Sequence, residues 1–193
     1  MVVLGIDPGT RRCGYGIVSR AGTRLTRLDS GVLVPGALPM AERLARILEG
    51  LGAILRAGRI DAVAVETAYF GLSARSALAL GQARGVAIAA AASAGLPVFE
   101  FAPAEVKRAF TGSGRAEKAQ MVRTAQAIFG IGARLADEAD ALAVAVCCLS
   151  RARQLAAPGA RGPRGAPVRP GNGAVRPTGK DRLRPAVRRF AKA

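Results

Sequence analysis

Two short apolar segments of this chain each end in an acidic residue: VVLGID ends at Asp7, and AVAVE ends at Glu66. Continuous apolar runs of this length are typical of strands that are covered on both faces of a sheet. A carboxylate at the end of a buried strand is costly unless a positive group neutralises it. Because the chain contains no histidine, we expect a hard divalent cation held by oxygen ligands.

Two more acids, Asp137 and Asp140, stand three residues apart at the start of a long apolar pattern, DEADALAVAVCCL. This spacing places both of them on one face of a helix. Glu138 lies about 100° around the same helix. There we expect a solvated first-turn acid that the helix dipole favours.

These four acids form the candidate active site. Ligands of open α/β folds collect at the carboxyl ends of strands, where Asp7 and Glu66 stand. If the helix bearing Asp137 and Asp140 packs at that edge, all four carboxylates converge. Such a set suits two Mg²⁺ or Mn²⁺ ions ~4 Å apart and in-line displacement at a phosphodiester, so we predict a metal-dependent nuclease. For any single acid, a helix cap or a salt bridge remains an alternative.

The order of apolar patterns predicts an α/β fold with a mixed five-stranded sheet flanked by helices. We assign residues 1–157 to this nuclease domain and residues 158–193, rich in Pro, Gly and Arg, to a disordered basic tail. The helix over 73–94 is rich in Ala and Gly, which allows packing against a second copy or ordinary burial on the sheet. The expected strands are 2–7, 14–19, 23–34, 62–66 and 97–101; the expected helices are 39–57 with Pro39 in the first position, 73–94 with Ser73 as cap, 103–110, 115–129 and 137–156.

Positive charge is concentrated at the end of the chain, which has a net charge of +16. Residues 151–193 hold 12 Lys/Arg and one acid, whereas residues 1–150 hold 17 Lys/Arg and 12 acids. We expect an anionic polymer as substrate, with the tail adding nonspecific affinity by counterion release or contacting a protein partner. The three cysteines show no zinc-ligand spacing. Without a basic leader or an apolar span, we expect a cytoplasmic protein with no membrane partner.

Five segments resemble, in the same order, the RuvC family of crossover (Holliday) junction endodeoxyribonucleases. The resemblance covers residues 2 to 153 and rests on GIDPGT, VETAYFG, ALGQARG, VKRAFTGSGRAEKAQM and DEADALAVA. It implies a ribonuclease-H-like fold, a homodimer, and Mg²⁺-dependent paired symmetric nicking of four-way DNA junctions during recombination and repair of damaged DNA. The expected products are 5′ phosphate and 3′ hydroxyl ends. It also suggests the RuvAB branch-migration complex as a partner.

The resemblance also implies roles for single residues. The family's metal-binding acids fall on the same four acids named above. Lys107 and Lys118 match basic residues near the scissile phosphate, although each also fits a solvated helix charge. Tyr69 matches an aromatic residue that wedges into the junction, with Phe70 beside it, and we expect at least one of the two to anchor its loop in the core. Stacking on a base would suit either ring.

Three alternatives remain open at this point. GIDPGT also resembles the first phosphate loop of actin-like and sugar-kinase-like ATPases, but that class needs two such halves and a second phosphate motif. A non-catalytic basic protein that binds nucleic acid would explain the charge and leave the four acids unexplained. A nuclease of the same fold could act on a different nucleic-acid substrate.

Overall fold

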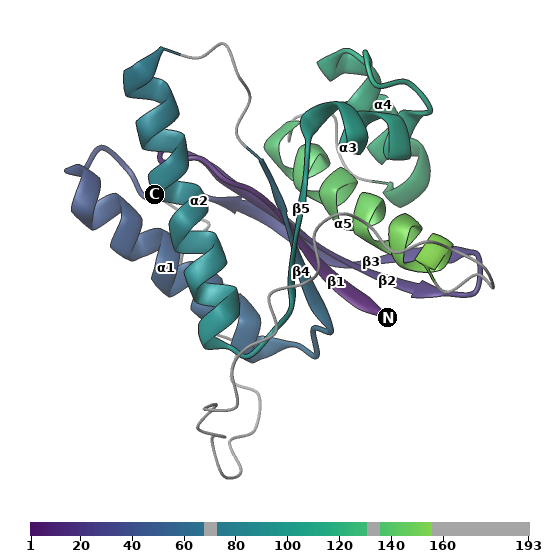
Figure 1. The fold of residues 1–193 in the computed structure, drawn as a ribbon, viewed down its shortest axis with the longest axis horizontal. Coiled ribbons are helices and arrows are strands. Elements are labelled where there is room, and N and C mark those ends of the chain that lie inside the picture. Colours follow the sequence, from purple (N-terminus) through teal and green to yellow (C-terminus); the bar gives the residue numbers. More distant parts are fainter. Residues whose placement is uncertain (68–72, 131–135, 156–193) are drawn as a thin grey trace, which may run out of the picture.

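The computed structural model describes residues 1–67, 73–130 and 136–155. These residues form five strands and five helices in the predicted order. The mixed sheet flanked by helices confirms the predicted fold class (Figure 1). The elements are β1 (Val2–Asp7), β2 (Cys13–Ala21), β3 (Arg24–Leu33), α1 (Met40–Ala57), β4 (Ala62–Glu66), α2 (Ala74–Ser93), β5 (Val98–Phe101), α3 (Pro103–Thr111), α4 (Lys118–Phe129) and α5 (Ala136–Leu155).

The strands lie in the order β3-β2-β1-β4-β5. β1, β2 and β3 form an antiparallel meander, while β4 and β5 run parallel to β1. β1 therefore sits in the centre, paired on both sides, and its residues from Val3 to Ile6 are buried. This explains why its sequence is continuously apolar rather than alternating.

Helices cover both faces of the sheet, with α1 and α2 on one face and α3, α4 and α5 on the other (Figure 1). Successive strand residues point to opposite faces. Leu4 and Ile6 of β1 join a core cluster with Ile47 and Leu51 of α1. Val3 joins a second cluster with residues of α3, α4 and α5. The sheet thus separates two hydrophobic cores.

Helix α5 lies unusually close to the sheet because three glycines remove side chains from its path. A Cβ on Gly5 would lie 2.1 Å from the Ala141 carbonyl oxygen, and one on Gly14 would lie 2.1 Å from the Asp137 carbonyl oxygen. Gly16 would meet Leu142 at 2.8 Å. Only glycine permits such backbone approach. The glycines therefore fix where the first turn of α5 meets β1 and β2.

Most element boundaries lie within one or two residues of expectation, and the starts of two helices show why they differ. Pro39 is not the first residue of α1 but the N-cap before it. Helix α4 begins at Lys118 rather than at residue 115. Before α4, Thr111 Oγ1 accepts a hydrogen bond from the Ser113 backbone N–H at 3.2 Å, and such local bonds compete with helix formation.

Other expectations are confirmed or lie outside the described residues. Ser73 caps α2 as predicted, since its Oγ accepts from the Ser76 N–H at 3.3 Å. Tyr69, Phe70 and the tail from 158 to 193 fall outside the described ranges, as does the domain boundary at 157. Within those ranges, no helix has the length and apolar character needed to cross a membrane.

Candidate active site

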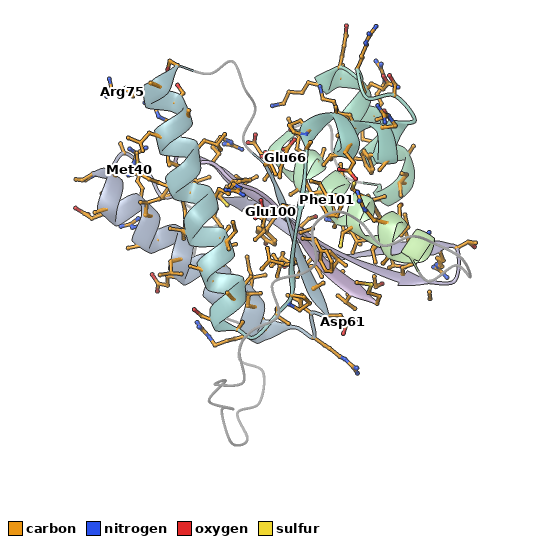
Figure 2. All side chains as sticks on the ribbon, viewed as in Figure 1. Met40, Asp61, Glu66, Arg75, Glu100 and Phe101 are labelled. Carbon is orange, nitrogen blue, oxygen red and sulfur yellow. The ribbon has the colours of Figure 1, made fainter. Side chains whose placement is uncertain are left out.

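Asp7 and Glu66 lie side by side at the ends of two central strands. The parallel ladder pairs Ile6 with Val65, so the next residue of each strand is one of these acids. The alternation along both strands turns Asp7 and Glu66 toward the face that α5 covers. Figure 2 shows Glu66 at the end of β4 opposite Asp61.

Asp137 lies near Asp7 because Gly14 allows the start of α5 to pack closely against β2. Asp7 pairs with Gly14 in the β1–β2 ladder, and Gly14 packs against the backbone of Asp137. Asp140 follows three residues later on α5, and its charge acts on both Asp7 and Glu66. The structure therefore gathers the four predicted acids at one edge of the sheet.

The pKa values of these acids show how poorly their charges are neutralised. Burial, together with repulsion from Glu66 and the two aspartates of α5, raises the pKa of Asp7 to about 8. Burial and repulsion from Asp140 raise the pKa of Glu66 to about 7, although a hydrogen bond with Asp7 and the charge of Lys107 act in the opposite direction. Burial is also the largest cause that raises the pKa of Asp140. Such crowding of like charges favours a bound cation.

Two lysines, Lys118 and Lys107, lie near the acids. Lys118 Nζ lies 4.0 Å from Asp137 Oδ1 and 3.9 Å from Asp140 Oδ2. It is the first residue of α4, where the helix dipole disfavours a positive charge, so the acids of α5 compensate for its position. Lys107, on α3, lowers the pKa of both Glu66 and Asp140 through its charge. The side chain of Lys118 is 64% exposed, which leaves it accessible to a substrate.

A third cation, Arg12, was not predicted from the sequence. It stands just before β2, and its Nε donates to Asp137 Oδ2 in an ion pair. Its place in the turn that follows Asp7 was the available signal. That signal was weak, because an arginine in a turn is usually solvated.

The expectation of a solvated Glu138 is wrong. Glu138 is 2% exposed, and its Oε1 accepts from Ser30 Oγ and from Arg27 Nη1, the latter at 3.4 Å. Its Oε2 is buried and has no hydrogen-bond partner among the residues that the structure describes. The reason is that α5 is buried on nearly all sides. Its Glu138 face, which would be exposed to water in a surface helix, packs against β3.

The donor set fits a hard divalent cation, because all four acids offer carboxylate oxygens and three of them, Asp7, Glu66 and Asp140, have raised pKa values. Nevertheless, in the described part of the chain no three such side chains stand close enough together to hold an ion as they are. In this arrangement Asp137 is paired with Arg12 and Lys118 instead.

A mixed sheet ordered β3-β2-β1-β4-β5, with acids ending adjacent central strands, defines the ribonuclease-H-like class. The family model described as "Crossover junction endodeoxyribonuclease RuvC" matches residues 3–148. A protein of that name from Anaeromyxobacter sp. (strain K) is 61% identical over 181 residues, covering 94% of this chain and 97% of the relative. Another from Citrifermentans bemidjiense is 47% identical over 149 residues, covering 76% and 91%.

A solved structure agrees with these relatives. "T. thermophilus RuvC in complex with Holliday junction substrate" has a TM-score of 0.73 and 36% sequence identity, covering 79% of this chain and 95% of that chain. The chain therefore belongs to the RuvC family of crossover junction endodeoxyribonucleases. This confirms the predicted family and enzyme class, and it does not favour the ATPase or the non-catalytic alternative.

Proposed function

We propose that this chain resolves four-way DNA junctions by paired symmetric nicks, with Asp7, Glu66, Asp137 and Asp140 as its metal-binding acids. The observation that carries the proposal is the meeting of these acids at one edge of the sheet, where burial and their mutual repulsion raise the pKa of Asp7 to about 8. The substrate follows from the T. thermophilus relative, whose structure contains a Holliday junction.

The proposed cofactor is Mg²⁺, with Mn²⁺ as an alternative, at two ions per site. When bound, such ions would supply an activated water and neutralise the charge that develops on the leaving 3′ oxygen. Asp7 and Glu66, fixed at the ends of paired strands, would hold them from the sheet side. Asp137 and Asp140 would hold them from α5.

Lys118 and Lys107 would face the phosphodiester. Each can offset negative charge that builds up on the scissile phosphate, and each already acts on the acids through its charge. The nicks would leave 5′ phosphate and 3′ hydroxyl ends. Wedging by Tyr69 or Phe70, the homodimer, the RuvAB partner, DNA binding by the tail and a cytoplasmic location stay predictions.

Replacing Asp7 tests this function most directly. Asp7→Asn keeps the shape but removes an anionic ligand, so we expect nicking of a synthetic four-way junction to fall by at least about 10³-fold. Junction binding should survive or tighten, because a negative charge near the phosphate is lost. The measurement is a gel assay in Mg²⁺, Mn²⁺ or EDTA, with plain duplex beside the junction.

Asp29→Asn is the matched control, since Asp29 is an exposed aspartate on β3, away from the four acids. It should nick junctions at the wild-type rate. Full activity of Asp7→Asn, or undiminished nicking by the wild type in EDTA, would remove Asp7 or the metal from the proposed mechanism.

A further inference from the structure

Arg12 is held at the edge of the candidate active site by a tight turn. Only five residues, 8–12, separate the end of β1 at Asp7 from the start of β2 at Cys13. A Cβ on Gly9 would lie 2.2 Å from the Arg12 carbonyl oxygen, so the turn folds back on itself closely. Gly14, two residues after Arg12, lies against the first turn of α5. The backbone of Arg12 is thus fixed relative to Asp137.

The side chain of Arg12 is less constrained than its backbone. It is 50% exposed, whereas that of Asp137 is 24% exposed. The guanidinium can therefore leave Asp137 and turn to solvent without moving the turn. An ion pair with one such exposed partner contributes little to stability and is easily replaced.

Both oxygens of Asp137 face a cation of the protein itself. Oδ2 accepts from Arg12 Nε, and Oδ1 lies 4.0 Å from Lys118 Nζ. Lys118 also lies 3.9 Å from Asp140 and so cannot fully neutralise either acid. By contrast, the only ion pair that Arg12 forms within residues 1–67, 73–130 and 136–155 is the one with Asp137. A divalent cation that takes Asp137 as a ligand must compete with Arg12 first.

We propose that Arg12 is a displaceable counter-ion: it holds Asp137 until divalent cations bind, and its released guanidinium then takes a phosphate oxygen of the DNA. This inference rests on the proposed metal site. A guanidinium suits both partners, because its planar fork binds carboxylates and phosphates alike. The exchange couples metal binding to contact with the substrate.

The first test measures Mn²⁺ binding to the full chain without DNA, by titration calorimetry. Arg12→Ala should bind Mn²⁺ about fivefold more tightly than the wild type, because the competing ion pair is gone. Arg11→Ala is the matched control, since Arg11 is exposed, adjacent and equal in charge. It should change the affinity by less than about twofold. Equal effects of the two variants, or weaker binding by Arg12→Ala, would overturn the proposal.

The second test measures the salt dependence of junction binding in Ca²⁺ and in EDTA, with intact DNA verified on a gel. Arg12→Ala should reduce the salt slope by ~1 in Ca²⁺ and leave it unchanged in EDTA. The slope of Arg11→Ala should not depend on Ca²⁺. A change in Arg12→Ala that is the same in both solutions would show that Arg12 is not released by the metal.

Asp7→Asn separates this inference from the proposed function. If that variant loses Mn²⁺ binding while Arg12→Ala behaves like Arg11→Ala, the metal site stands and the role of Arg12 fails. If Asp7→Asn binds Mn²⁺ as the wild type does, the proposed metal site fails, and the role of Arg12 fails with it.

Discussion

Glu138 and Asp7 are acids that meet the same helix turn in opposite electrostatic settings. Glu138 is fully buried, and its Oε1 accepts hydrogen bonds from Arg27 and Ser30, so the fold provides partners for this oxygen. Asp7 is partly buried beside Glu66, Asp137 and Asp140, so its nearest charges repel it. The first arrangement fastens α5 to β3. The second leaves buried acids that repel one another at the candidate active site, and this repulsion disfavours their charged forms.

Raising the pH should lower the free energy of unfolding, because Asp7 must then carry its charge while buried. This is the largest effect that we expect. The pKa of Asp7 is about 8 in the folded chain and near its ordinary value of about 4 when unfolded. Between these values the folded state binds more protons, so stability falls as pH rises from about 4 to about 8. We expect a loss on the order of 3 kcal/mol, measured by urea unfolding in EDTA.

The Asp7→Asn variant is the control for that pH dependence. It should make the fall in stability with pH smaller, because one of the three acids with a raised pKa is gone, whereas Asp29→Asn should leave the pH dependence unchanged. Divalent cations should also flatten it by stabilising the charged form. If the free energy of unfolding of Asp7→Asn depends on pH as that of the wild type does, Asp7 does not cause the pH dependence. The contrast between Asp7 and Glu138 would then be wrong.

Removing the partner of Glu138 should make that acid resemble Asp7. Arg27→Ala leaves a buried carboxylate without its cation, so we expect a loss of ~2 kcal/mol in the free energy of unfolding. Glu138→Gln should lose less than ~1 kcal/mol, because the remaining Arg27 side chain is 38% exposed and can reach water. Chemical denaturation measures both, with exposed Arg24→Ala on the same strand as control. Equal losses in Arg27→Ala and Glu138→Gln would show that the burial of Glu138 does not determine which variant is less stable.

The lysines beside the unmatched acids should affect binding rather than folding, and this effect is the smallest. Lys118→Ala and Lys107→Ala should each lower the salt slope of junction binding by ~1, as expected for one phosphate contact. Arg59→Ala removes an equal charge near the opposite end of β4 from Glu66, where Arg59 pairs with Asp61 at 3.9 Å. It should not change the slope. An unchanged salt slope in both variants would indicate that Lys107 and Lys118 are solvated helix charges that do not contact phosphate.

Much of the scaffold was predictable because it depends on neighbours along the chain. Apolar runs predicted β1 and β4, and their last residues predicted where Asp7 and Glu66 stand. The spacing of Asp137 and Asp140 predicted a shared helix face, and Ser73 predicted a cap. These features follow from the strand and helix periods alone.

The partners of the charges were not predictable in the same way. Arg12 and Asp137 are 125 residues apart, and Arg27 and Glu138 are 111 apart. Residue types show which groups carry charge, but not which of them packing will bring together. Gly5 and Gly14 decided this by letting α5 approach β1 and β2.

By itself, then, the sequence determined the order of the elements and the four acids at their ends. Only the tertiary structure decided that Glu138 is buried with Arg27 and that Arg12 engages Asp137. The physical reason is that periodicity is a local property of the chain. Neutralisation of a buried charge depends on groups that meet only when distant segments pack.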